Sequence, residues 1–125
     1  MRRLIGDMQA TAQALGASGD AALETMAKAL GDGIKAMADA SLWLGGKLMA
    51  APNDALAGAT PYLRLAGLVV GGWLLAKEGL AVVERGAPDD AGRAKLDTIR
   101  FYATNLLPQA AGFAAAATSG VDTHG

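Results

Sequence analysis

The stretch PYLRLAGLVVGGWLLAKEGLAVVE, residues 61–84, decides the fold. Placed on a helix, its apolar residues recur at alternating steps of four and three, which is one helical face. The residues of this face are Tyr62, Ala66, Val69, Trp73, Ala76, Leu80 and Val83. Leucines, valines and alanines fill the other faces too, and only a line of Arg64, Glu78 and Arg85 stays polar. Since a helix that is apolar nearly all round is a buried helix, we predict that this one is largely buried.

A membrane-spanning helix is the alternative for this stretch, and its length argues against it. The uncharged run extends only from Leu65 to Ala76, whereas a spanning helix needs roughly 20 apolar residues. Lys77 and Glu78 would also lie at membrane depth, where charges are costly. We therefore expect this helix to lie in a protein core, and we expect no membrane partner.

The composition bounds the class of protein. A chain of 125 residues suggests one domain with a sizeable core. The net charge of -1 implies no broad attraction to nucleic acid, so we expect no such partner. Cysteine is absent, which excludes disulfides and thiolate metal sites, and the first residues contain no secretory segment. We expect a cytoplasmic protein, and the abundance of alanine and leucine favours an all-α class.

Two further helices are expected before the central one. Residues 3–15 predict a short helix that ends at Gly16, and residues 20–50 predict a long one capped by Ser18 or Asp20. The long helix has a heptad seam made of Leu23, Ala27, Leu30, Ile34, Met37, Ser41, Leu44 and Leu48. Pro52 ends it, and a short segment follows up to Gly58. Thr60 is then expected to cap the central helix.

The last helical region is expected to begin at Asp89 and Asp90 and to kink at Pro108. Its inward seam is predicted to comprise Leu96, Ile99, Ala103, Leu106, Ala110, Phe113 and Ala117. Together these elements predict an up-and-down bundle of about four helices, the third largely buried. We divide the chain into a link and short helix at 1–18, a bundle domain at 19–120 and a flexible tail at 121–125.

No catalytic or metal-binding constellation is visible in the sequence. His124 is the only histidine and has no companion, and the pair Asp89–Asp90 is explained as a helix start. We therefore expect no catalytic residue, no metal and no cofactor site. Eight residues are structural or interface candidates: Tyr62, Arg64, Trp73, Arg100, Tyr102, Asn105, Pro108 and Gln109. If Arg64 is buried, it needs a partner such as Asp97 or a C-terminal carbonyl.

Four motifs in this order carry a family resemblance. They are TPYLRL at 60–65, GGWLLA at 71–76, RFYA at 100–103 and LLPQA at 106–110. The chain, from about Leu4 to Asp122, resembles the C-terminal helical domain of acyl-CoA dehydrogenases, in the long bacterial subfamily that includes the 3-methylmercaptopropionyl-CoA dehydrogenases. Ala66 departs from the pattern, which usually has phenylalanine there.

The resemblance implies a parent enzyme that carries FAD and performs α,β-dehydrogenation of an acyl-CoA thioester. The residues that bind flavin and acyl-CoA belong to a portion preceding this domain and have no matching positions here. The implied role is therefore non-catalytic: packing on the catalytic domain and helping to assemble a homo-oligomer. Two alternatives remain open. One is a stand-alone module that dimerises through the seam from Leu23 to Leu48, and the other is a carrier of small hydrophobic ligands over Gly71, Gly72 and Trp73.

Overall fold

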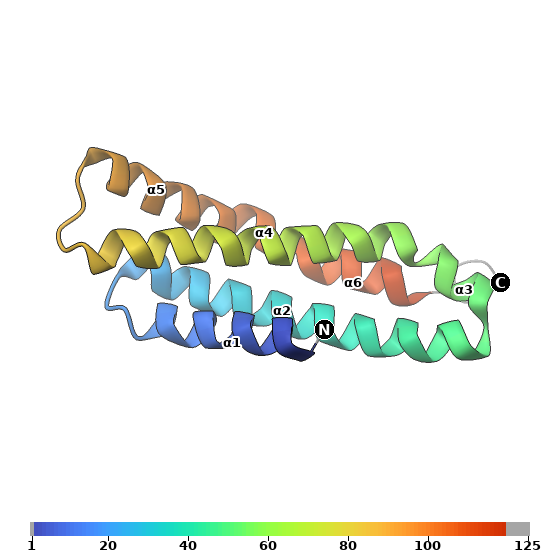
Figure 1. The fold of residues 1–125 in the computed structure, drawn as a ribbon. Coiled ribbons are helices and arrows are strands. Elements are labelled where there is room, and N and C mark those ends of the chain that lie inside the picture. Colours follow the sequence, from blue (N-terminus) through green and yellow to red (C-terminus); the bar gives the residue numbers. More distant parts are fainter. Residues whose placement is uncertain (1, 120–125) are drawn as a thin grey trace.

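The computed structural model describes residues 2–119, and all the regular structure in this range is helical (Figure 1). The helices are α1 (Arg2–Gly16), α2 (Ala21–Ala50), α3 (Pro52–Ala57), α4 (Ala59–Glu84), α5 (Asp90–Phe101) and α6 (Ala110–Ser119). Between α5 and α6 lie a π-helical turn, Tyr102–Leu106, and a 3₁₀ turn, Leu107–Gln109. The predicted all-α class is confirmed. The predicted flexible tail and His124 lie outside the described residues.

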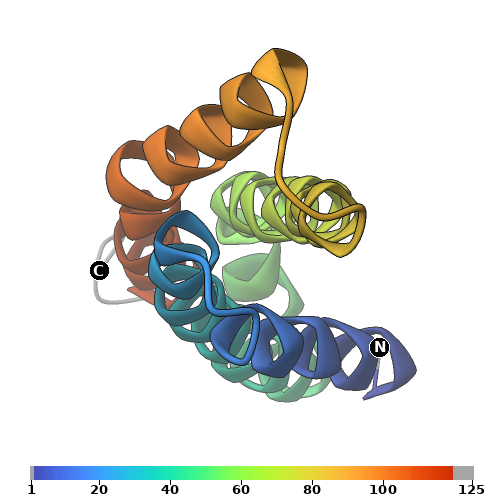
Figure 2. The ribbon, with the colours of Figure 1, turned by 90° about the vertical axis from the view of Figure 1, so that its left-hand side faces the viewer.

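The bundle is built on two long antiparallel helices, α2 and α4 (Figure 1). The shorter α1 runs back along the N-terminal half of α2 and also contacts α4. Towards the other end, α6 lies beside both long helices, while α5 packs beside the C-terminal half of α4. Figure 2 looks along the bundle and shows α1, α2, α4 and α5 around a shared interior. The predicted up-and-down bundle is therefore correct.

Local signals set most of the helix boundaries. The Asp20 carboxylate accepts a hydrogen bond from the Leu23 amide at 3.1 Å, and that of Asp89 accepts one from the Gly92 amide at 2.8 Å. These caps satisfy amides that the first turn leaves free. Gly86 follows α4 with φ +101, a conformation that suits glycine. The predicted cap at Thr60 is wrong, because α4 begins at Ala59 with Gly58 before it and no side-chain cap.

The core is entirely apolar within the described residues. Its largest fully buried side chains are Met8, Leu15, Leu23, Met26, Leu30, Ile34, Met37, Leu65, Val69, Ile99 and Leu107. Close approach of the helices depends on glycine at α2, since a Cβ added to Gly33 would lie 3.2 Å from Val69 Cγ2. Met8 and Leu15 show that α1 shares this core. The proposed division at residue 18 stays a prediction.

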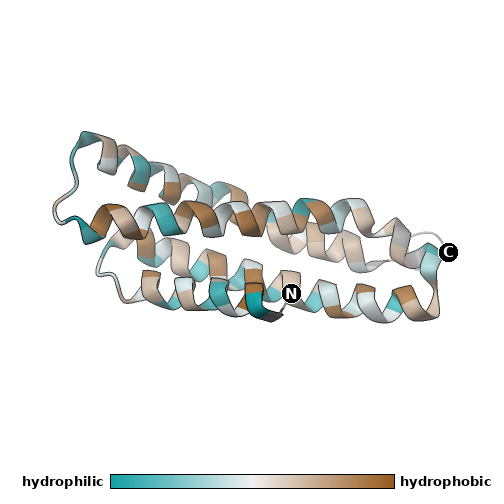
Figure 3. Cartoon of the chain, in the orientation of Figure 1, coloured by the Kyte–Doolittle hydropathy of each residue, from teal (hydrophilic) through white to brown (hydrophobic). Residues whose placement is uncertain are grey.

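The burial of α4 differs from the prediction. One face is buried, formed by Leu65, Val69, Gly72, Ala76 and Gly79. On the opposite face Leu63 is 69% exposed and Leu74 is 52% exposed, and Figure 3 shows brown, apolar bands along much of α4. By length and composition alone α4 could cross a membrane, and 22% of its most apolar 18-residue window is buried within the bundle. The prediction failed because the neighbouring helices are too few to surround α4.

The last helical region is interrupted, as expected, near Pro108. The Leu107 amide donates to the Tyr102 carbonyl, five residues back, which is the spacing of a π turn. The wide turn places Leu107, at 1% exposure, in the core, whereas Leu106 is only half-buried. The predicted inward position at Leu106 is therefore off by one residue.

Candidate functional site

Three of the candidate aromatic residues tie helices together by hydrogen bonds. The Tyr62 hydroxyl and the Ser41 hydroxyl are 2.5 Å apart, joining α4 to α2. Trp73 Nε1 donates to Thr11 Oγ1 at 2.9 Å, joining α4 to α1. All four side chains are half-buried, so each bond satisfies a polar group at the margin of the core. The role supported by this geometry is structural.

The third tie is made by Tyr102, whose hydroxyl donates to the Leu68 carbonyl of α4 at 2.6 Å. Burial raises the pKa of this phenol above its usual value. The ring also fills the space over the paired glycines of α4, since a Cβ added to Gly72 would lie 3.1 Å from Tyr102 Cε1. A ligand groove over Gly71 and Gly72 was one alternative from the sequence, and Tyr102 occupies that place.

The polar candidates at the surface form no cluster. Arg64 is exposed on the outward face of α4, so it does not need the partner, Asp97 or a C-terminal carbonyl, that a buried arginine would require. Arg100 is exposed as well. The ion pair on the neighbouring surface joins Lys95 Nζ to Glu78 Oε2 at 2.7 Å and links α5 to α4.

Asn105 and Gln109 act within their own helical segment. Asn105 Nδ2 donates to the Phe101 carbonyl and Gln109 Nε2 donates to the Asn105 carbonyl, both at 3.1 Å. Pro108 lies exposed between them and has no amide to donate. These side chains supply hydrogen bonds where the backbone ladder is irregular, so both residues and Pro108 shape the bend rather than a binding site.

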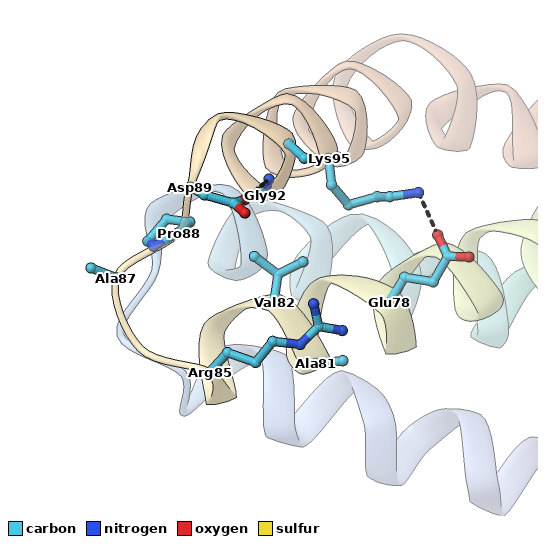
Figure 4. Close-up of a pocket in the computed structure, with 10 residues that line it drawn as sticks. Glu78, Ala81, Val82, Arg85, Ala87, Pro88, Asp89, Gly92 and Lys95 are labelled. Carbon is cyan, nitrogen blue, oxygen red and sulfur yellow. Dashed lines mark hydrogen bonds and ion pairs between the residues drawn. The ribbon is translucent and has the colours of Figure 1, made fainter.

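One open hollow of about 490 Å³ lies at the corner between α4 and α5 (Figure 4). Arg85, Pro88 and Asp89 line it together with the Glu78–Lys95 ion pair, and Figure 4 shows the two charged pair members meeting across it. The Asp89 carboxylate is engaged as the cap of α5. The hollow offers no nucleophile paired with a base, so the arrangement has no evident catalytic use.

A second concavity, of about 540 Å³, runs between the C-terminal half of α2 and the N-terminal half of α4. We call it the α2–α4 groove, and its lining residues are Ser41, Leu44, Gly45, Leu48, Ala55, Ala59, Tyr62 and Leu63. Its polar members, Ser41 and Tyr62, bond to each other. The groove therefore presents an almost entirely apolar surface.

Neither concavity fits a dinucleotide cofactor. The pyrophosphate of a flavin dinucleotide needs amide or cationic donors, as at a glycine-rich helix start. The α2–α4 groove has no cationic side chain on its lining. In the α4–α5 hollow Arg85 and Lys95 are cationic, but Lys95 is paired with Glu78 and the Gly92 amide donates to the Asp89 carboxylate. Within residues 2–119 no three His, Asp or Glu side chains gather as metal ligands.

Comparison with known protein families shows to which family the chain belongs. The family described as "Acetyl-CoA dehydrogenase C-terminal like" matches residues 4–124. The chain belongs to this family. It is therefore a C-terminal domain of the acyl-CoA dehydrogenase type, as the motifs indicated, while the subfamily stays a prediction. No curated relative and no solved structure matches the chain.

Membership of this dehydrogenase family implies FAD and a catalytic domain in the parent enzyme. Within this domain the ties made by Tyr62, Trp73 and Tyr102 hold the helices of the bundle together. Sequence reasoning missed their partners Thr11 and Ser41. Ser41 carried a signal, because it is the one hydroxyl residue inside an otherwise apolar seam.

Proposed function

We propose that this chain is a non-catalytic helical domain of an acyl-CoA dehydrogenase-like flavoenzyme. The parent enzyme carries FAD and removes hydrogen across the α,β bond of an acyl-CoA thioester in the cytoplasm. The domain packs on the catalytic portion and helps to assemble subunits. The family match across residues 4–124 is the observation that carries this proposal.

The outward face of α4 is our candidate for the contact with the catalytic portion. Leu63 and Leu74 are 69% and 52% exposed, on the most apolar long helix of the chain. An apolar face of this kind is stabilised by burial, at roughly 25 cal/mol per Å². Arg64 beside Leu63 supplies a charged rim, as is usual around protein interfaces. The family relationship supports the catalytic portion as the partner, and the exposed leucines support the outward face of α4 as the contact surface.

The proposal is tested by tagging the protein in its source cells and purifying it under native conditions. We expect flavin absorbance and acyl-CoA-dependent reduction of a dye, carried on the same polypeptide or on a bound one. The isolated 125-residue chain mixed with FAD and acyl-CoAs should give no turnover. A tagged protein free of flavin, or turnover by the chain alone, would contradict the proposal.

The proposed face is tested by the variant L63E/L74E. Charges on this face should lower the temperature at which the purified flavoprotein releases its flavin, because they oppose burial of α4. The matched control is F101E, which places a charge on another exposed large apolar residue, 59% exposed, on α5. If L63E/L74E and F101E lower the flavin-release temperature equally, the outward face of α4 is not the contact surface.

A further inference from the structure

The methionines of the described chain fall into two groups. Met8 and Met26 are fully buried and Met37 is 1% exposed, so these three lie in the core. Met49 lies in the last turn of α2 and is 89% exposed. Within residues 2–119 a single methionine therefore presents its thioether to solvent, and it has little contact with the rest of the chain.

Exposure is what decides the reactivity of a methionine towards oxidants. A cysteine reacts as its thiolate, so access alone does not make it reactive. The thioether of methionine carries no proton and its sulfur lone pairs are available at any pH, so its oxidation depends on whether the oxidant reaches the sulfur. Burial therefore predicts the order in which the methionines of this chain react.

The core methionines are held where an oxidant has no path to them. Protein interiors are packed with few voids larger than a water molecule. The methyl carbon Cε of Met26 illustrates this packing, since it would lie 3.4 Å from a Cβ added to Gly72 of α4. Oxidation of Met8, Met26 or Met37 therefore requires the helices to separate, which costs part or all of the free energy of unfolding.

We propose that Met49 is a reversible oxidation site, and that hydrogen peroxide converts it to the sulfoxide while the chain stays folded. A lone pair of the sulfur forms a bond to one peroxide oxygen as the O–O bond breaks. The other oxygen leaves as hydroxide and takes up the proton of the transferred oxygen, which gives water. The sulfur loses two electrons and the peroxide gains them. Methionine sulfoxide reductases reverse the change.

The oxidation alters the surface at the end of α2 and leaves the core as it is. Leu42 and Leu48 are 78% and 57% exposed at the same end of the helix, so Met49 is part of an apolar stretch of surface. A sulfoxide is polar and accepts hydrogen bonds, so oxidation makes this stretch more hydrophilic. It thereby changes how the end of α2 meets other molecules. The inference does not depend on the proposed function.

The first test follows these methionines separately. The folded chain is treated with hydrogen peroxide, and peptide mass spectrometry measures the sulfoxide fraction at each methionine over time. Met49 should react at least about tenfold faster than Met8, Met26 or Met37, because those three react only when the helices open. In the matched control the same treatment is applied in denaturant, where Met49 and the core methionines should react at similar rates.

The second test uses two variants that cannot be oxidised at this position. M49L keeps the surface apolar, and M49Q makes it polar with a side chain of similar length. On a hydrophobic-interaction column the peroxide-treated wild-type chain should elute earlier than the untreated chain, near M49Q, while treated and untreated M49L should elute together. Methionine sulfoxide reductase should restore the original elution of the wild type. The thermal unfolding midpoint should be the same before and after oxidation, because Met49 is 89% exposed.

Three results would overturn the inference. They are equal sulfoxide fractions at Met49 and a core methionine in the folded chain, a shift in the elution of M49L after peroxide treatment as large as that of the wild type, and a lower thermal unfolding midpoint for the wild type oxidised at Met49 alone. The first would mean that burial does not protect the core methionines, and the last that Met49 supports the fold. None of the three bears on flavin content, so the proposed function stands or falls separately.

Discussion

The two halves of α2 contrast sharply although one heptad seam runs through both. In the first half Leu23 and Leu30 are fully buried, whereas in the second half Leu48 is 57% exposed. α1 lies beside the first half of α2 and does not extend along the second half (Figure 1). A heptad pattern therefore specifies a face that can be buried, and the length of the neighbouring helix decides how much of it is.

The glycines of α2 are of two kinds. Gly33 has side chains within 3.4 Å of the place a Cβ would take, whereas Gly31, Gly45 and Gly46 have open space there. The first kind is explained by contacts within the chain, and for the second kind no neighbouring atom requires glycine.

The largest expected effect comes from truncating the seam in its packed half. L30A should lower the free energy of unfolding by about 2–5 kcal/mol, because it removes a fully buried leucine and leaves a cavity. L48A on the same seam should cost less than about 1 kcal/mol, since Leu48 is largely exposed. Denaturant titration at concentrations where the chain is monomeric measures both. Equal losses of unfolding free energy in L30A and L48A would contradict the difference in burial between the two halves of α2.

The next effect tests the glycines. A Cβ at Gly58 would overlap the backbone carbonyl of Ala117, so G58A should destabilise the chain by about 1–3 kcal/mol. G31A, where a Cβ meets nothing, should instead stabilise it by about 0.4–1 kcal/mol. The two substitutions are chemically identical, and thermal unfolding compares them directly. A destabilising G31A would show that open space around a glycine does not predict tolerance.

Tyr102 should have an intermediate effect, about 1 kcal/mol for Y102F, because the Leu68 carbonyl loses its donor. Burial raises the pKa of this phenol. The unfolded chain therefore ionises Tyr102 first, and stability is lost as pH rises from about 10 upward, through the folded-state pKa. Y102F should lack this part of the loss, and the control Y62F should retain it. The free energy of unfolding of both variants is measured across that pH range. An equal loss in Y102F and Y62F would contradict the assignment of this loss to Tyr102.

The smallest effect is expected at the Lys95–Glu78 pair. Both side chains are exposed, at 39% and 58%, so the ion pair is screened by water despite its length of 2.7 Å. K95M should change the free energy of unfolding by less than about 0.5 kcal/mol, with less effect at high salt. A double-mutant cycle with E78Q isolates the pair. A coupling energy above about 1 kcal/mol would mean that the α4–α5 corner is more rigid than its exposure indicates.

The helices themselves were predictable because their signals are local. Asp20 and Asp89 cap the helices that follow them, and Pro52 marks the end of α2, as expected from the sequence. The inward face of α2 was correct up to Met37 for the same reason, since helical periodicity depends only on spacing. These features need no knowledge of which helix lies beside which.

The failures arose where helical spacing alone is not enough. The central helix was expected to be largely buried because it is apolar on most sides, yet Leu63, Arg64 and Leu74 are exposed on its outward face. Leu106 was placed inward because an α-helical register was carried through residues that form a π turn. Of the structural or interface candidates, Tyr62, Trp73 and Tyr102 make hydrogen bonds between helices. Their partners on α1, α2 and α4 could not be named until the helices were placed side by side.

The wide turn at Tyr102–Leu106 has a consequence for length variation in this chain. It accommodates one residue more than an α-helical turn would hold, so deleting a single residue there could restore regular spacing. The same deletion placed in the regular turns of α5 would instead rotate everything that follows by about 100° and swing Ala110 and Ala117, both now buried, away from the long helices. Loss of one residue should therefore be tolerated better in the wide turn than in the helix that precedes it.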